Sequence, residues 1–264
     1  MIGLFDSGIG GLTVVRALRA ARPDLSYVYV GDTARAPYGT KSPETIRRYA
    51  EEAAAFLKAK GAKAIIIACN TASSLAAEHL REAHPELPIF EVVGPAVRMA
   101  QRVSAKKKIG LIGTRATVAS GIYERRLKEL DPSIEIVAKA APLLVSLVEE
   151  GWIDQPETAT IVGKYLASIR EAEVDALILG CTHYPILKDL IAKTMGESVK
   201  LVDSAEGVVA EFCATLERDP SFAASLDTSG RTAHFVTDPT PAFSTLGSRW
   251  LGTDIVVSQI HLSP

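Results

Sequence analysis

The feature that most constrains the fold is a divergent pattern that occurs twice along the chain. It consists of three matched pairs: I-G-L-F at 2–5 with I-G-L-I at 109–112, P-E-T at 43–45 with P-E-T at 156–158, and A-I-I-I-A-C-N-T at 64–71 with A-L-I-L-G-C-T-H at 176–183. The pairs follow in the same order at nearly the same separation, so chance similarity of apolar strands is the weaker explanation. The sequence therefore predicts two related halves.

Short apolar runs alternate with helical segments in both halves. The predicted strands are Ile2–Phe5, Tyr27–Val30, Ala64–Ala68, Ile89–Val93, Ile109–Ile112, Ile134–Val137, Ala176–Leu179 and Lys200–Val202. The clearest predicted helix runs from Pro43 to about Lys60, with Ser42 as its N-cap and Gly61 at its end. Such alternation predicts parallel sheets covered by helices.

We therefore expect an α/β fold of two similar domains with mostly parallel sheets, related by pseudo-symmetry. In open α/β sheets, ligands bind at the carboxyl ends of the strands. The predicted active site thus lies in the cleft where the two halves meet, beside the turns that follow the matched strands.

The composition excludes several classes of protein. The chain has 264 residues, 47% of them hydrophobic and 23% charged, which excludes a disordered chain. No apolar stretch reaches the ~18 residues that span a bilayer. The balanced charge, −2 overall, predicts no nucleic-acid or membrane partner. The first residues lack the basic and apolar regions of a signal peptide, so we expect a cytoplasmic protein.

Neither a metal nor a cofactor is expected. The cysteines Cys69, Cys181 and Cys213 form no C-x-x-C pair, so zinc has no support, and they are too few for a disulfide framework. The segment 8–11, G-I-G-G, resembles a dinucleotide fingerprint, but Thr13 stands where the third glycine belongs. Asp6 would also repel a pyrophosphate.

Cys69 and Cys181 occupy the same place in the two halves, after a strand and before an expected helix N-terminus. Such a position lowers the pKa of a thiol from about 8.5 toward neutrality. Cys213 lies instead in an apolar helical stretch, 207–216, and is expected only to pack.

Two matched thiols across one cleft favour inversion of a carbon acid. One thiolate removes the α-proton from one face, and the opposite thiol returns a proton to the other face. Hydrogen-bond donors in the same turns would stabilise the carbanion and bind a carboxylate. Asp6 and His183 are placed to assist one cysteine each.

Four blocks of sequence closely resemble the cofactor-independent glutamate racemases. They are D-S-G-I-G-G-L at 6–12, G-D-T-A-R-A-P-Y-G at 31–39, A-C-N-T-A-S at 68–73 and G-C-T-H-Y-P at 180–185. The resemblance extends over the whole chain and is weak after about residue 215.

The resemblance implies interconversion of L- and D-glutamate for peptidoglycan synthesis, without pyridoxal phosphate or metal. It implies that Cys69 and Cys181 are the acid/base residues, with Asp6 and His183 assisting. Glu149, which is followed by Glu150, matches a further family carboxylate. The substrate contacts that it implies are Asp6, Ser7, Pro37, Tyr38, Gly39, Asn70, Thr71, Thr114, Thr117, Thr182 and His183.

The resemblance also implies a homodimer and two domains, 1–97 with 206–264 and 98–205. Three alternatives stay open. An aspartate racemase of the same superfamily differs in substrate by one methylene, worth only about 1–3 kcal/mol. A Cys-His-Asp hydrolase or acyltransferase leaves the second cysteine unexplained. A binding module without catalysis would tolerate the loss of both thiols.

Overall fold

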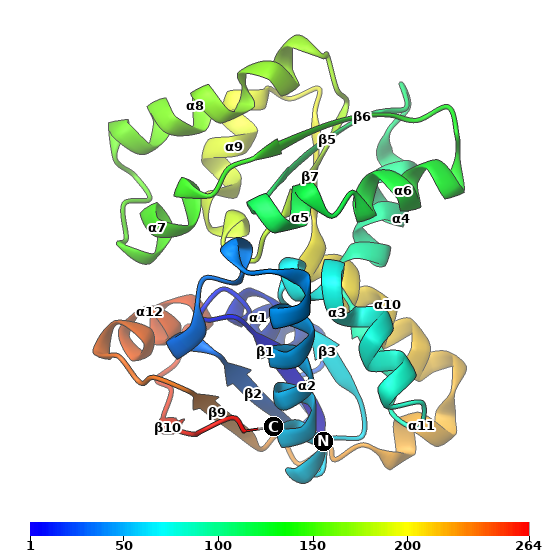
Figure 1. The fold of residues 1–264 in the computed structure, drawn as a ribbon, viewed down its shortest axis with the longest axis vertical. Coiled ribbons are helices and arrows are strands. Elements are labelled where there is room, and N and C mark those ends of the chain that lie inside the picture. The colour runs from blue at the N-terminus through cyan, green and yellow to red at the C-terminus, as the bar shows by residue number, and fades with distance from the viewer. Residues whose placement is uncertain (264) are drawn as a thin grey trace.

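The computed structural model describes residues 1–263, and the strands in this range form two sheets (Figure 1). The strands are β1 (Ile2–Asp6), β2 (Tyr27–Gly31), β3 (Ile65–Ile67), β4 (Ile89–Glu91), β5 (Lys108–Gly113), β6 (Glu135–Ala140), β7 (Ala176–Gly180), β8 (Lys200–Asp203), β9 (Thr232–Val236) and β10 (Val257–Gln259). One sheet has the order β10-β9-β2-β1-β3-β4 and the other β6-β5-β7-β8. Every pairing of neighbours is parallel, as expected.

Helices connect the strands and cover both sheets. They are α1 (Leu12–Ala21), α2 (Pro43–Ala59), α3 (Asn70–Ala83), α4 (Val93–Val103), α5 (Arg115–Ala119), α6 (Ile122–Leu130), α7 (Leu143–Glu149), α8 (Pro156–Glu171), α9 (Lys188–Met195), α10 (Ser204–Arg218), α11 (Pro220–Ser225) and α12 (Pro241–Leu251), with 3₁₀ turns η1 (Thr33–Arg35), η2 (Tyr38–Thr40) and η3 (Tyr184–Leu187). Within residues 1–263, no helix has the length and hydrophobicity needed to cross a membrane.

The two sheets share one topology, which confirms the predicted repeat. The order β2-β1-β3-β4 in the first sheet matches β6-β5-β7-β8 in the second. The register matches as well, because Gly3 pairs with Ile65 in the first sheet and the equivalent Gly110 pairs with Leu177 in the second. In Figure 1 the six-stranded sheet lies in the lower half of the molecule and the four-stranded sheet in the upper half.

Each sheet buries both of its faces, which explains the continuous apolar runs of its strands. The first sheet packs against α2 and α3 on one face and against α1, α10 and α12 on the other. The second sheet packs against α4 and α6 on one face and α7, α8 and α9 on the other. The helices α4 and α10 also pack on each other beside the junction of the two sheets.

The predicted helix after Ser42 is confirmed as α2. The Thr45 backbone N–H donates to Ser42 Oγ at 3.3 Å, so Ser42 is a side-chain N-cap, and Pro43 occupies the first turn. The chain leaves the helix through Gly61, whose φ of +85° is a conformation that favours glycine.

The eight predicted strands are present with small shifts at their ends. The largest shift is at β6, which extends to Ala140 instead of Val137. The strand β4 ends earlier than predicted, at Glu91, because the Glu91 carboxylate accepts hydrogen bonds from Val93 N (2.6 Å) and Gly94 N (3.0 Å) and so caps α4. The strands β9 and β10 were not predicted. They extend the first sheet beyond β2, so the C-terminal segment in orange and red lies beside the N-terminal strands in Figure 1.

Candidate active site

The two matched cysteines lie at the carboxyl ends of equivalent strands. Cys69 follows β3 and Cys181 follows β7, and both line one small cavity of about 30 Å³. Both side chains are buried. Since β3 and β7 are in different sheets, the two thiols approach the cavity from different halves of the molecule.

Most of the predicted site residues line this inner cavity. Its lining consists of Ser7, Pro37, Tyr38, Gly39, Cys69, Asn70, Thr71, Thr114, Val145, Cys181, Thr182 and His183. Val145 was not predicted, because an apolar residue on a helix carries no chemical signal. The structure places Asp6, Thr117 and Glu149 behind the lining, each bonded to a residue that does line the cavity.

A wider outer cavity of about 240 Å³ lies beside the inner one and shares several of its lining residues. Its wall includes His183, Glu149, Ser146 and Arg115, and the 37–40 loop contributes from the other half. This outer cavity places the charged groups Glu149 and Arg115 next to the thiols and hydroxyls of the inner cavity.

Cys69 is the N-cap of α3, as predicted. Its Sγ accepts from Ala72 N at 3.5 Å and lies 3.7 Å from Ser7 Oγ. The expected lowering of its pKa is wrong for this closed site, because burial, together with the nearby Asp6 charge, raises the pKa of Cys69 to about 12. Cys69 is therefore a protonated thiol in this structure, ready to donate.

Cys181 has a different environment. Its Sγ lies 3.7 Å from His183 Nδ1, and His183 Nε2 lies 2.9 Å from Glu149 Oε1. Burial opposes a charge on His183, but hydrogen bonds to Cys181 and Glu149 outweigh it and raise the pKa of His183 to about 10. A protonated His183 can donate a hydrogen bond to both Cys181 Sγ and Glu149 Oε1.

The expected helix N-terminus after Cys181 is absent. The residues that follow form the 3₁₀ turn η3, and α9 begins only at Lys188. Pro185 inside this turn removes a backbone donor, which is compatible with the first turn of a helix but not with a continuous α-helix from Cys181. The positive partner of Cys181 is thus His183 rather than a helix dipole.

Asp6 lies at the end of β1, between the two halves. Its carboxylate accepts from Gly8 N at 2.9 Å and from Thr182 Oγ1 at 3.3 Å, so it joins the first turn to the turn after Cys181. Burial raises the pKa of Asp6, while the charge of His183 partly opposes that rise. Asp6 is therefore poised to exchange a proton near the cavity.

Two glycines allow the halves to approach closely. A Cβ atom on Gly10 would lie 2.2 Å from Thr182 Oγ1, and one on Gly39 would lie 2.7 Å from Thr114 Cβ. The glycine-rich segment 8–11 is thus explained by contact with the Cys181 turn, and dinucleotide binding is not needed to account for it.

Asp32 is a supporting residue that sequence reasoning missed. Its buried carboxylate accepts from the Tyr38 hydroxyl, from Arg35 Nε at 2.7 Å and from Thr237 Oγ1 at 3.0 Å. Asp32 therefore anchors the loop that carries Tyr38 to the cavity. Its position directly after β2, at the same edge of the sheet as Asp6 at the end of β1, was the available signal.

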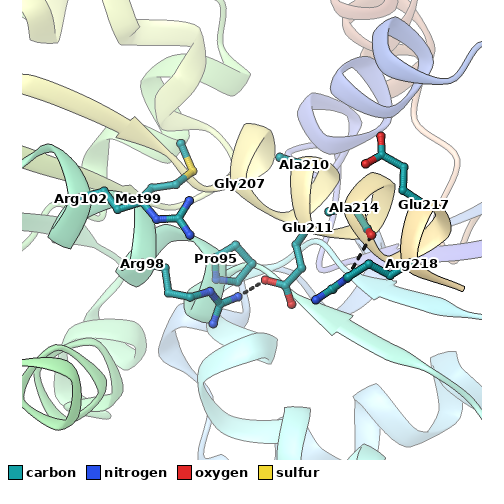
Figure 2. A pocket seen from close by; sticks show the side chains of 10 residues that line it. All are labelled: Pro95, Arg98, Met99, Arg102, Gly207, Ala210, Glu211, Ala214, Glu217 and Arg218. Carbon is teal, nitrogen blue, oxygen red and sulfur yellow. Dashed lines mark hydrogen bonds and ion pairs between the residues drawn. The ribbon is translucent and has the colours of Figure 1, made fainter.

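A larger cavity of about 600 Å³ lies elsewhere, between α4 and α10, and holds neither thiol. Figure 2 shows its side chains, with Arg98 paired to Glu211 and Arg218 donating to the Ala214 carbonyl. Among residues 1–263, no cluster of three or more His, Cys, Asp or Glu side chains is arranged to hold a metal ion. The chemistry-bearing side chains converge on the inner cavity instead.

Comparisons with known proteins agree with this geometry. The model of the Asp/Glu/Hydantoin racemase family matches residues 12–212. A glutamate racemase of Geobacter metallireducens is 45% identical over 251 residues, covering 95% of this chain and 92% of the relative. A Bacillus anthracis glutamate racemase isoform superposes with a TM-score of 0.93 at 37% identity, covering 99% of this chain and 97% of the other.

A second solved structure, the Francisella tularensis glutamate racemase in complex with D-glutamate, has a TM-score of 0.91 at 36% identity. It covers 99% of this chain and 97% of its own. The family model covers well over half of the sequence, and the relatives match it nearly from end to end. The chain therefore belongs to the Asp/Glu/Hydantoin racemase family.

Proposed function

We propose that this chain is a glutamate racemase that interconverts L- and D-glutamate by proton transfer at Cys69 and Cys181, without a cofactor. The observation that carries the proposal is the convergence of the two thiols, from equivalent strand ends, on one small cavity. The relatives that match almost the whole chain are named glutamate racemase, which supports glutamate over aspartate as the substrate.

The two thiols have complementary starting states for such a reaction. Cys181, beside the His183 imidazolium, acts as the thiolate base, and Cys69, whose pKa is about 12, acts as the opposing acid. The roles exchange in the reverse direction, for which Asp6 is placed to accept the proton that Cys69 must release. A proton removed on one face and returned on the other inverts the α-carbon.

The surrounding donors supply the electrostatic stabilisation that the carbanion needs. The hydroxyls of Thr71, Thr114 and Thr117 form one cluster, with Oγ1–Oγ1 distances of 2.9 to 3.3 Å. With Asn70 and Ser7 they provide donors for the two substrate carboxylates.

The inner cavity must enlarge to admit the substrate. A volume of about 30 Å³ accommodates one or two water molecules and not an amino acid. We infer that residues 1–97 with 206–264 form one domain and residues 98–205 the other, and that their separation opens the cleft. The arrangement of the two sheets supports this division.

Three further properties follow from the family resemblance. The product D-glutamate would serve peptidoglycan synthesis, the enzyme would act in the cytoplasm, and two copies would form a homodimer. A sedimentation measurement tests the dimer directly, since a single species at the mass of one chain would contradict it.

The proposed activity is tested by incubating the protein with L-glutamate in D₂O. Loss of the α-proton signal by NMR should accompany the decay of optical rotation, with no added cofactor. Exchange with aspartate but not glutamate would favour an aspartate racemase, and exchange with neither would refute the racemase proposal. Hydrolysis of an ester without exchange would favour the Cys-His-Asp alternative.

Variants of the cysteines test the two-thiol mechanism. Cys69→Ser and Cys181→Ser should each lose nearly all racemisation while keeping the fold, since serine is a far weaker acid and base at neutral pH. Cys213→Ser is the matched control, because Cys213 only packs against the core. Full activity of either cleft variant would contradict the mechanism.

A further inference from the structure

Tyr123 lies in one half of the molecule, and the residue to which its hydroxyl is hydrogen-bonded, Asn70, lies in the other half. Tyr123 is the second residue of α6, which begins after Gly121, and its buried hydroxyl lies 2.5 Å from Asn70 Oδ1. Asn70 is the first residue of α3, directly after Cys69, and lines the inner cavity. Tyr123 itself is absent from that lining.

The hydrogen bonds around Asn70 have only one consistent direction. Ser204 Oγ lies 3.2 Å from the Leu179 carbonyl oxygen, which can only accept, so Ser204 uses its proton there. Ser204 Oγ must then accept from the Asn70 side chain, 3.2 Å away. The amide nitrogen of Asn70 therefore faces Ser204, its oxygen faces Tyr123, and the Tyr123 hydroxyl is the donor.

Tyr123 is suited to permanent donation. Its side chain is 1% exposed, and burial, with nearby negative charge, raises the pKa of the phenol well above its ordinary value. The hydroxyl therefore keeps its proton across the range of pH in which the thiols react. An amide held at both ends in this way cannot rotate to exchange its oxygen and nitrogen.

We propose that Tyr123 is a positioning residue that, with Ser204, fixes the Asn70 amide so that its remaining N–H binds a carboxylate of the substrate. This rests on the proposed function, since it assigns a role to a residue of the same cavity. One N–H of Asn70 is used on Ser204, and the second is left for a ligand. An N–H binds a carboxylate oxygen and repels an ammonium group, which has no acceptor.

The first experiment compares Tyr123→Phe with the wild type, using α-proton exchange of glutamate and inhibition by glutarate. Glutarate keeps both carboxylates of glutamate and lacks its ammonium group. The variant should raise the KM for glutamate and the inhibition constant of glutarate by a similar factor, about tenfold, with a smaller change in kcat. A rise in the KM for glutamate without a similar rise in the inhibition constant of glutarate would overturn the proposal.

Tyr27→Phe is the matched control. Tyr27 is also a buried tyrosine, and its hydroxyl contacts His234 Nε2 at 3.1 Å, at the opposite end of β2 from the cleft. It should lower stability without changing the KM or glutarate binding. The comparison separates loss of a buried hydroxyl from loss of the Asn70 constraint.

A double-variant cycle separates positioning from a general structural role. In an Asn70→Ala background, Tyr123→Phe should have almost no further effect on kcat/KM, because no amide is left to orient. If Tyr123→Phe lowers kcat/KM as much in the Asn70→Ala background as in the wild type, the proposal is overturned. Ser204→Ala serves if Tyr123→Phe fails to fold, and it should weaken glutarate and glutamate alike. Wild-type exchange is measured first, and its absence would refute the proposed function itself.

Discussion

Nδ1 of His183 lies 3.7 Å from Sγ of Cys181, while no histidine approaches Cys69 among the hydrogen-bonded contacts of residues 1–263. The two proposed acid/base residues therefore have different proton partners. Cys181 is paired with an imidazolium, and Cys69 is surrounded by a hydroxyl, a backbone N–H and the Asp6 carboxyl group.

His183→Gln should lower kcat by about 100-fold, because the proton donor that contacts Cys181 Sγ is lost. The values of kcat/KM for the two enantiomers must stay equal, since the enantiomers have equal free energy. The kinetic isotope effects measured with the α-deuterated substrates, in contrast, need not stay equal for the two enantiomers. We expect the isotope effect to increase more for the enantiomer that Cys181 deprotonates. Equal increases in the isotope effect for both enantiomers would contradict this asymmetry.

Glu149→Gln should move the alkaline limb of the kcat/KM profile to lower pH. Glu149 is one of the hydrogen-bond partners that raise the pKa of His183 to about 10, so its removal lowers that pKa and the imidazolium is lost earlier as pH rises. The Glu149 side chain is 45% exposed, so the loss at neutral pH should be modest, about threefold to tenfold.

Glu150→Gln is the matched control for that measurement. Glu150 is exposed and follows the end of α7, whereas Glu149 contacts His183. The pH profile should be unchanged in Glu150→Gln. An equal shift in both variants would show that general surface charge, rather than the Glu149–His183 contact, sets the alkaline limb.

Arg126→Gln should lower the free energy of unfolding by about 2–4 kcal/mol. Arg126 Nη1 on α6 lies 2.6 Å from Glu91 Oε1, and the buried Glu91 carboxylate would lose its cation. Urea unfolding measures the loss. Adding Glu91→Gln should recover part of it, and Arg125→Gln, an exposed neighbour 3.8 Å from Glu129, should change stability by about 0.5 kcal/mol at most.

Acid should destabilise the fold partly through His234. Burial lowers the pKa of His234 from 6.5 to about 4, so the folded state keeps the ring neutral while the unfolded chain binds a proton. The contribution of the neutral His234 ring to stability is fully present above pH 6.5 and is lost as pH falls toward 4. The loss between pH 7 and pH 5 should be smaller by about 2 kcal/mol in His234→Gln than in the wild type. The exposed His261→Gln should behave as the wild type.

The sequence predicted the repeated framework well because buried parallel strands are continuous apolar runs. The strands β9 and β10 were not predicted, because they lack such a continuous apolar run. His234 and Thr232 interrupt the hydrophobicity of β9, and β10 is the short, largely exposed edge V-S-Q. Such strands receive their structure from the neighbours they pair with, β2 for β9 and β9 for the edge strand β10, and a local pattern cannot contain that information.

The sequence predicted those residues of the candidate site that have reactive or polar side chains or a matched position in the repeat. The matched thiols, His183 and the cleft hydroxyls carry a signal in their side chains. Tyr123 and Val145 carry none, because a tyrosine or valine at an apolar helix position is ordinarily a core residue. Their importance depends on which helix the tertiary fold brings to the cavity.

The late position of β9 has a consequence for synthesis on the ribosome. Thr237, just after β9, holds the Asp32 carboxylate that in turn holds Tyr38. Both thiols emerge long before that residue does. A nascent chain halted between α11 and β9 would carry both thiols and His183 yet lack the support of the Tyr38 loop. We therefore expect activity to appear only near the end of translation.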